Sequence, residues 1–129
     1  MPKEIRYLSF SRSEVIRAAT EYLRKRRMAP SPGTIVGYRL EAEPEVKLVL
    51  TVAPSVGNLR QDIELKSESL GAALVLFCIE ARVPTPARAV KTLFVDAETL
   101  ILALSIGLTG EDREMFFEKP PPLLVKSID

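Results

Sequence analysis

The chain repeats one pattern of residues, and this repeat constrains its fold more than any other feature. Residues 13–52 align without a gap on residues 67–106, and nine of the forty aligned pairs are identical. The matches come in the same order in both copies: Ser-Glu at a helix start, an Ala-Ala pair, a Pro-x-Pro segment and alternating apolar residues. The sequence therefore predicts two copies of one structural unit.

Each copy is expected to contain a strand, a helix and then a hairpin of two strands. Apolar alternation predicts the strands, and a helical period of apolar residues predicts the helices. These elements fall at residues 5–10, 14–27, 34–40 and 46–52 in the first copy, and at 62–66, 68–82, 90–95 and 100–106 in the second. The first helix is capped either by Ser11, which has Glu14 in the capping-box position, or by Ser13, which matches Ser67.

Two such units predict an α+β fold that is a tandem duplication of a strand-helix-strand-strand unit. We expect a mostly antiparallel six-stranded sheet with the two helices on one face, in a single domain of residues 1–129. The pseudo-repeats cover about residues 5–53 and 60–106. Residues 107–129 form a C-terminal tail without a counterpart, and its apolar residues predict that it docks on its own subunit or on a neighbour.

The order of these elements, over about residues 5–106, resembles the tandem strand-helix-strand-strand arrangement of a known fold. That fold is the small-molecule-binding fold shared by gyrase-inhibitory proteins and SOUL haem-binding proteins. The resemblance lies in the order of elements and not in a sequence motif. It concerns the fold alone, because one fold hosts many functions.

Charge and composition narrow the classes of partner. The net charge is +1, but residues 1–30 carry eight Lys or Arg and only three Glu. This balance argues against a general affinity for nucleic acid and leaves a local basic patch. A single cysteine and an N-terminus without the apolar core of a signal peptide predict a cytoplasmic location. The longest apolar run, residues 70–79, is about half of a membrane span, so no membrane association is expected.

Few residues suggest catalytic or metal chemistry. Histidine is absent, which removes the commonest general base and the commonest zinc ligand. Cys78 lies among apolar residues, where a thiol is expected to be packed and inert. Carboxylates at the two hairpin tips suit either a hard cation or a solvated turn, and we expect the turn; these are Glu41, Glu43, Glu45, Asp96 and Glu98. The sequence predicts no catalytic residue, metal or cofactor, although Ser, Lys, Tyr and carboxylate side chains leave catalysis open.

The first helix ends in a run of four cations, Arg24, Lys25, Arg26 and Arg27. Such a run binds phosphates in some proteins, and in others it complements the negative end of the helix dipole. No aromatic series accompanies it, which disfavours single-stranded nucleic acid. We expect the structural role and keep anion binding as the alternative.

The second helix differs from the first on its outward side. The outward charged residues Arg17, Glu21, Arg24 and Lys25 align with Gly71, Val75, Cys78 and Ile79, which form one helical stripe. The inward positions expected in the core are Ile16, Ala19 and Leu23 in the first helix, and Leu70, Ala73 and Phe77 in the second. The second helix is thus apolar on two sides, and the outward side needs a cover.

A second copy of the chain is the cover that we expect, through the stripe of Gly71, Val75, Cys78 and Ile79. The tail and a small apolar ligand are the other possible covers. The function expected is therefore non-catalytic binding or scaffolding by a homodimer. The alternatives are a small-molecule sensor or carrier with a cleft between the repeats, and a polyanion binder that uses the basic end of the first helix.

Overall fold

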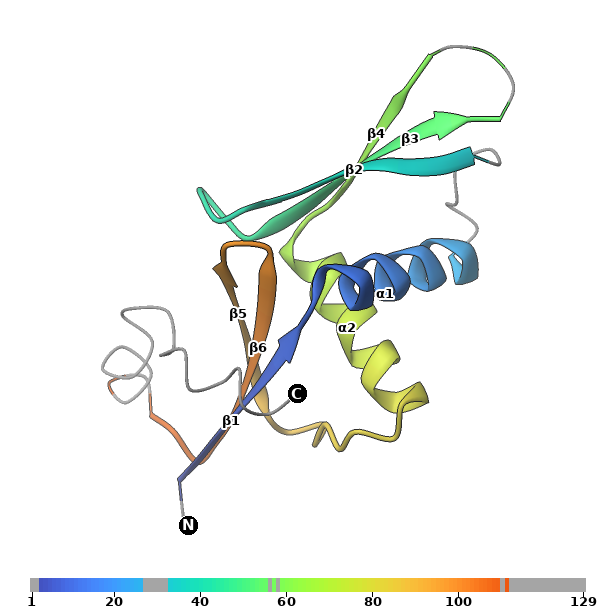
Figure 1. Cartoon of the computed structure of the whole chain (residues 1–129). Coiled ribbons are helices and arrows are strands. Elements are labelled where there is room, and N and C mark those ends of the chain that lie inside the picture. Colours follow the sequence, from blue (N-terminus) through green and yellow to red (C-terminus); the bar gives the residue numbers. More distant parts are fainter. Residues whose placement is uncertain (1–2, 27–32, 56, 58, 110, 112–129) are drawn as a thin grey trace.

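A computed structural model of the chain describes residues 3–26, 33–55, 57, 59–109 and 111 (Figure 1). The same order of elements, strand, helix, strand and strand, occurs twice along the chain. The elements are β1 (Glu4–Phe10), α1 (Arg12–Lys25), β2 (Gly33–Glu41), β3 (Lys47–Pro54), β4 (Gln61–Leu65), α2 (Ser67–Glu80), β5 (Val90–Asp96) and β6 (Thr99–Ile106). The described chain is thus an α+β structure with the predicted hairpins β2–β3 and β5–β6.

The two helices begin in different ways. Ser11 caps α1, and its side chain accepts a hydrogen bond from the amide of Glu14 while the Glu14 carboxylate accepts one from the amide of Ser11, 2.9 Å away. This capping box confirms Ser11, and not Ser13, as the cap. Helix α2 has Lys66 at its N-cap without a side-chain hydrogen bond. Ser67 instead donates its hydroxyl to the backbone oxygen of Val46, 2.5 Å away.

The strands form two separate antiparallel sheets of three strands each, with the orders β1-β6-β5 and β2-β3-β4. The prediction of a single six-stranded sheet is therefore wrong for the described residues. Apolar alternation determines which side chains of a strand face inward, but it does not determine which strands become neighbours. Each sheet combines the first strand of one half with the hairpin of the other half.

The pairing of strands is equivalent in the two sheets. Phe10 lies opposite Leu100 at one end of the β1–β6 pair, and Leu65 lies opposite Leu48 at the corresponding end of the β4–β3 pair. All four side chains are buried, so each first strand contributes an apolar anchor to the other half's hairpin. Exchange of the first strands links the halves through both hydrogen bonds and apolar packing.

The helices lie side by side in Figure 1 and join both sheets through one apolar cluster. Phe10 of β1 packs edge-on against Phe77 of α2, with ring centroids 6.0 Å apart. The core positions predicted on the two helices are buried at Ala19, Leu23, Leu70 and Ala73, and partly buried at Ile16 and Phe77. Neither described helix has the length and apolar character needed to cross a membrane.

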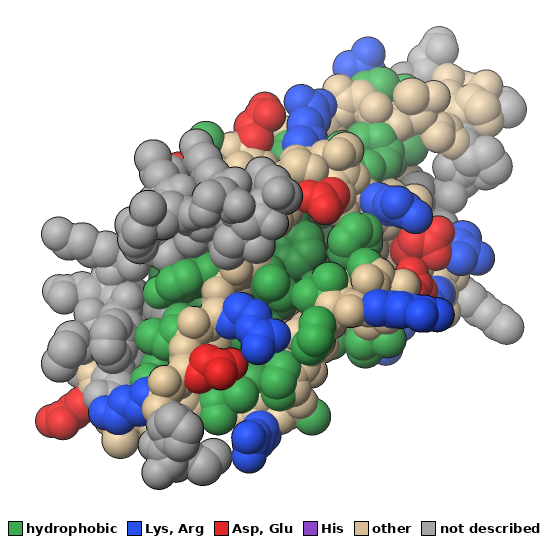
Figure 2. Space-filling view, turned by 60° about the horizontal axis from the view of Figure 1, so that its bottom comes forward, with side chains coloured by type: hydrophobic (Ala, Val, Ile, Leu, Met, Phe, Trp, Pro, Cys, Tyr) green, Lys and Arg blue, Asp and Glu red, His purple; other side chains and the backbone are tan. Residues whose placement is uncertain are grey.

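Some apolar side chains remain on the surface. Figure 2 shows a face on which apolar side chains gather, with Lys, Arg, Asp and Glu between and around them. The large apolar side chains that are exposed among the described residues are Val36, Leu59, Ile79 and Val90. Of these, only Ile79 belongs to the stripe predicted on the second helix.

Candidate ligand-binding cleft

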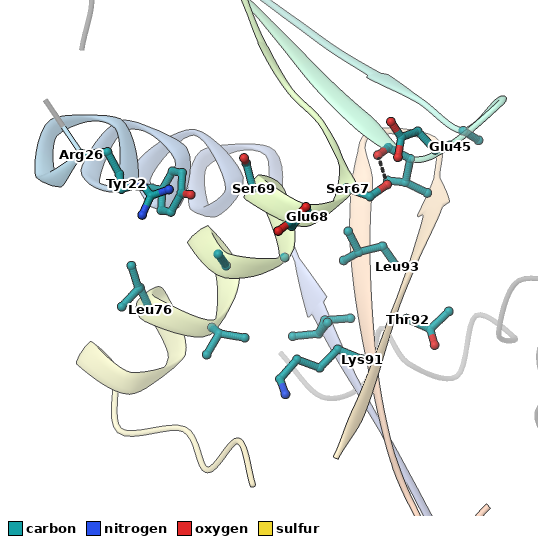
Figure 3. Close-up of a pocket in the computed structure, with 16 residues that line it drawn as sticks. Tyr22, Arg26, Glu45, Ser67, Glu68, Ser69, Leu76, Lys91, Thr92 and Leu93 are labelled. Carbon is teal, nitrogen blue, oxygen red and sulfur yellow. Dashed lines mark hydrogen bonds between the residues drawn. The ribbon is translucent and has the colours of Figure 1, made fainter. Parts of the chain in front are cut away.

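A cleft of about 1,080 Å³ lies over α2, between strand β5, the turn that joins β2 to β3, and the end of α1 (Figure 3). Residues from both halves of the chain line it. Its volume is slightly above the range of about 300–1,000 Å³ that is usual for small-molecule sites. The cleft is therefore the described feature that best suits a ligand.

The apolar part of the cleft comes from one side of α2 and from the second sheet. Gly71, Val75 and Leu76 of α2 line it, and Leu93 and Leu102 line it from the β5–β6 hairpin. Leu93 points towards α2 in Figure 3. A Cβ atom added to Gly71 would meet no atom within 4 Å beyond its neighbours and the adjacent backbone of α2, so the absence of a side chain there leaves open space. This surface suits an apolar ligand.

A hydrogen bond holds one wall of the cleft in place. The hydroxyl of Ser67 donates to the backbone oxygen of Val46 and thereby fixes the β2–β3 turn against the start of α2 (Figure 3). This turn places Glu45 at the cleft, and the first turn of α2 adds Glu68 and Ser69. The wall therefore offers carboxylates and a hydroxyl at the edge of the apolar surface.

Two cations also line the cleft, one from the end of α1 and one from β5. Tyr22 of α1 is buried, and the guanidinium carbon of Arg26 lies 5.4 Å from the centre of its ring. This is the range of a cation–π contact, which holds the Arg26 side chain beside the cleft. Lys91 of β5 donates its ammonium to the backbone oxygen of Ala89, 3.1 Å away, and also lines the cleft. The rim thus contains charges of both signs.

The corresponding place in the other half of the molecule is occupied by a tyrosine. Leu48 of β3 and Leu100 of β6 are equivalent residues. Tyr38 lies two residues before the β2 residue that pairs with Leu48, and Leu93 lies two residues before the β5 residue that pairs with Leu100. Tyr38 and Leu93 therefore have equivalent positions. The Tyr38 hydroxyl donates to the backbone oxygen of Glu98, 3.0 Å away.

The guanidinium of Arg12 lies over the Tyr38 ring, 5.4 Å from its centre, and also pairs with Glu98 at 3.7 Å. Burial, followed by the negative charge of Glu98, raises the pKa of Tyr38 to about 12. Tyr38 therefore joins β2 to the turn between β5 and β6, whereas Leu93 makes an apolar wall of the cleft.

The stripe predicted on the second helix is divided by the structure. Gly71 and Val75 line the cleft, and Ile79 is 59% exposed and is not among the lining residues. Cys78 is only 1% exposed, so its placement on the outward side is wrong. Whether these residues form a subunit interface stays a prediction.

The misplacement of Cys78 has a simple geometric cause. The gapless alignment pairs each residue of α1 with a residue of α2 at one fixed spacing. Four buried residues of α1 match four buried residues of α2 at a spacing one residue longer: Val15 with Leu70, Ala18 with Ala73, Ala19 with Leu74, and Leu23 with Cys78. Cys78 therefore takes the core position of Leu23. Burial raises the pKa of its thiol, and the Glu14 carboxylate adds a smaller effect in the same direction, as expected for a packed cysteine.

The described cations at the end of α1 each have an intramolecular contact. Arg24 pairs with Glu21 at 2.6 Å, which lowers the pKa of the Glu21 carboxyl. Lys25 pairs with Glu80 at the end of α2. Arg26 stacks on the Tyr22 ring, and Arg27 lies outside the described residues. These contacts favour the structural interpretation of the basic run, with Arg26 alone also lining the cleft.

Metal chemistry finds no support among the described residues. No group of three or more His, Cys, Asp or Glu side chains in that part of the chain could hold a metal ion. Glu41, from the predicted acidic tip, is instead paired with Arg39 at 2.8 Å and with Lys47 at 3.5 Å. Glu43, Glu45 and Glu98 are exposed, and Asp96 is partly buried.

Sequence reasoning missed most of the residues that form the cleft. Tyr22 and Leu93 were expected only as members of a helix and a strand, and Ser67 only as the match of the possible cap Ser13. One signal was available: the turn between β2 and β3 is longer than the turn between β5 and β6. A longer turn reaches further and builds a wall, so comparing turn lengths between the copies would have pointed to this side of the molecule.

Comparisons of the chain with protein-family models, with curated proteins and with solved structures find no match.

Proposed function

We propose that the protein binds a small apolar ligand with a polar end in the cleft over α2, as a non-catalytic sensor or carrier. The cleft itself carries this proposal, because its apolar surface and charged rim come from both halves of the chain. Apolar sites with a few polar groups at the edge are the usual form of small-molecule sites. We therefore propose a sensor or carrier in place of the scaffold that was expected from the sequence.

The rim suggests how a ligand would be oriented. Arg26 and Lys91 offer donors to an acidic or strongly polar acceptor group, and Glu45 and Glu68 offer acceptors to a donor group. The apolar part of the ligand would lie against Val75, where covering apolar surface contributes about 25 cal/mol per Å². A ligand without an apolar body is not expected to bind.

The proposal is tested with N-phenyl-1-naphthylamine, an uncharged apolar dye whose fluorescence rises when it leaves water. We expect saturable binding of one dye per chain. Val75→Glu places a carboxylate on the apolar surface of the cleft and should weaken dye binding at least about tenfold, which is 1.4 kcal/mol. Ile79→Glu, a matched change on the same helix outside the cleft, should leave the affinity unchanged. Equal affinities in both variants would contradict the proposal.

Self-association through α2 is the second candidate function, and the exposure of Ile79 is the observation that favours it. An apolar side chain of this size, 59% exposed, suits a contact with another α2 helix across a two-fold axis. A ligand in the cleft and a partner at Ile79 are compatible, because Ile79 does not line the cleft. The cytoplasmic location stays part of the proposal, supported by the free cysteine, Cys78. The single domain also stays part of it, supported by the one apolar cluster that joins the helices to both sheets.

A tandem duplication is the origin that we propose for the two halves. The repeated order of elements supports it, as do the equivalent pairs Phe10–Leu100 and Leu65–Leu48. Under this proposal the equivalent positions Tyr38 and Leu93 diverged after the duplication, and the half with Leu93 has the cleft beside its helix.

A further inference from the structure

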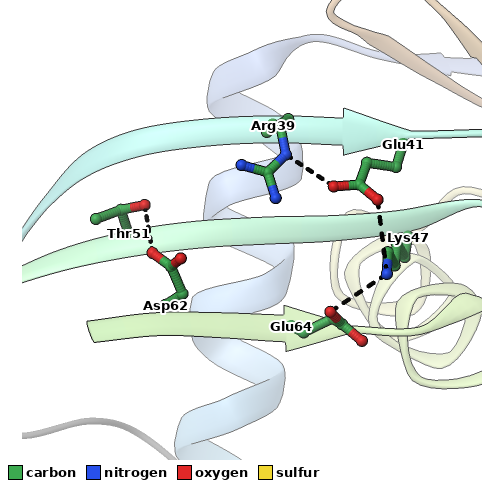
Figure 4. Close-up of polar contacts among 6 residues, drawn as sticks. All are labelled: Arg39, Glu41, Lys47, Thr51, Asp62 and Glu64. Atoms are coloured by element: carbon green, nitrogen blue, oxygen red, sulfur yellow. Dashed lines mark hydrogen bonds and ion pairs between the residues drawn. The ribbon is translucent and has the colours of Figure 1, made fainter. Parts of the chain in front are cut away.

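The two sheets differ in the chemistry of the faces that point away from the helices. On sheet β2-β3-β4 this face carries a row of charges: Arg39 pairs with Glu41, and Lys47 pairs with Glu41 and with Glu64 at 3.4 Å (Figure 4). Thr51 adds a hydrogen bond to Asp62 at 2.8 Å. Charged side chains are mostly exposed to solvent, so this face needs no cover.

The equivalent face of sheet β1-β6-β5 has no such row. The strand registers place Phe94 where the other sheet has Arg39, Tyr7 where it has Asp62, and Ser9 where it has Glu64. On the central strand, Ile101, Ala103 and Ser105 take the positions of Val49, Thr51 and Ala53. Uncharged side chains thus replace charged ones at each of the three flanking positions.

Burial differs at two of the three positions on the central strand. Ala103 and Ser105 are 0% and 1% exposed, whereas Thr51 and Ala53 at the equivalent positions are only partly buried. Ile101 and Val49 are both buried. The apolar cluster that contains the helices includes Leu100, Leu102 and Leu104 but not Ile101 or Ala103. The helices therefore do not account for the burial of this face. A single chain already buries these residues, so a second copy is not needed to cover them.

We propose that residues 112–129 of the same chain dock on this face of sheet β1-β6-β5. The chain leaves the sheet at the end of its central strand, Ile106, and Gly107 follows with φ 76°, a left-handed conformation that lets the chain turn back. The segment contains the apolar groups that such a cover requires, Met115, Phe116, Phe117, Leu123, Leu124 and Val125. A backbone amide or carbonyl of the segment would also partner the Ser105 hydroxyl, which has no hydrogen-bond partner among the described residues.

In this proposal the tail covers sheet β1-β6-β5 and not the outward side of α2. It leaves the apolar part of the cleft over α2 free for a ligand, since that part and this face lie on opposite sides of strand β5; of the residues on this face, Thr92 also lines the cleft. Leu93 of β5 lines the cleft, whereas the neighbouring residue Phe94 belongs to the other face. The inference does not depend on the proposed function.

The chain contains no tryptophan, which provides a direct test in the full-length protein. Phe116→Trp and Leu124→Trp, in separate variants, each introduce a single reporter. The proposal predicts that at least one reporter has blue-shifted emission and an acrylamide quenching constant several-fold lower than that of free tryptophan. Adding Ala103→Arg on the face should shift this emission to that of exposed tryptophan. Thr51→Arg, the matched change on the other sheet, should have no effect.

Three results would overturn the proposal. The first is exposed emission from both reporters in the full-length protein. The second is buried emission that neither Ala103→Arg nor the milder edge variant Tyr7→Lys changes; Tyr7→Lys covers the case in which Ala103→Arg does not fold. The third is protection that disappears on dilution, because it would identify a second copy as the cover.

Discussion

Tyr38 of β2 is hydrogen-bonded through its hydroxyl to the backbone oxygen of Glu98, 60 residues away in the turn between β5 and β6. This contact joins the hairpins of the two halves. Because burial raises the pKa of Tyr38 from 10.0 to about 12, the folded state holds this proton more tightly than the unfolded state. The contribution of Tyr38 to stability is therefore complete below pH 10 and is lost as the pH rises from 10 towards 12.

Tyr38→Phe tests this linkage. The variant should be less stable than the wild type at pH 8, because Glu98 loses a donor, by about 0.5–1.5 kcal/mol. The difference should shrink as the pH rises above 10, since only the wild type has a hydroxyl at this position to ionise on unfolding. Urea unfolding at pH 8, 9, 10 and 11 measures it, and a difference that stays constant with pH would refute the role of Tyr38.

Leu70 is the buried residue of α2 that matches Val15 of α1, and it is 0% exposed. Leu70→Ala should lower the free energy of unfolding by about 2–5 kcal/mol, because it leaves a cavity in the core. Ile79→Ala on the exposed side of the same helix should change it by less than about 0.5 kcal/mol. Denaturant midpoints measure both, and equal midpoints would show that the inward face of α2 is assigned wrongly.

The basic end of α1 should not behave as a polyanion site. Arg24 and Lys25 already pair with Glu21 and Glu80, so a phosphate would compete with carboxylates of the same chain. We expect weak binding to a heparin column, with elution at low salt, and little change in Arg24→Gln/Arg27→Gln. Retention to high salt by the wild type, abolished in this double variant, would instead establish a phosphate-binding function.

Self-association has a readout that separates it from ligand binding. If two copies meet through α2 at Ile79, Ile79→Glu should lower the mass measured by light scattering at tens of micromolar to that of one chain. Dye binding in the cleft should be retained in this variant, because Ile79 does not line it. A wild-type mass of one chain at the same concentration would rule out the dimer and leave the cleft unaffected.

The order and type of the elements were predictable from the sequence because apolar periodicity is local. The alternation Leu48, Leu50 and Val52 predicted β3, and residues 67–80 lie within a long apolar helical pattern. The neighbours of β1 were not predictable, because Leu8 and Phe10 suit either hairpin and only tertiary packing selects β6. The single six-stranded sheet failed for that reason.

The candidate site was only partly predictable. The comparison of the two helices singled out a stripe of which Gly71 and Val75 line the cleft. It included Cys78 because identical residues, such as Ala18 and Ala72, favoured a gapless alignment. The buried residues of the two helices match at a spacing one residue longer than in that alignment, and this match places Cys78 in the core. The rest of the cleft comes from segments far apart in the chain, for which a local pattern has no information.

The most direct test of the proposed cleft uses Gly71, where added atoms meet open space and not protein. Gly71→Ala should stabilise α2 by about 0.5–1 kcal/mol and leave dye binding nearly unchanged, because a methyl group occupies little of the cleft. Gly71→Phe should fold and yet bind the dye at least about tenfold more weakly, because its ring occupies the space over α2. Ile79→Phe adds a ring to the same helix outside the cleft and should bind the dye as the wild type does. The decisive measurement is the dissociation constant of N-phenyl-1-naphthylamine for folded Gly71→Phe: a large increase is the result we predict, and a value equal to that of the wild type would contradict ligand binding in this cleft.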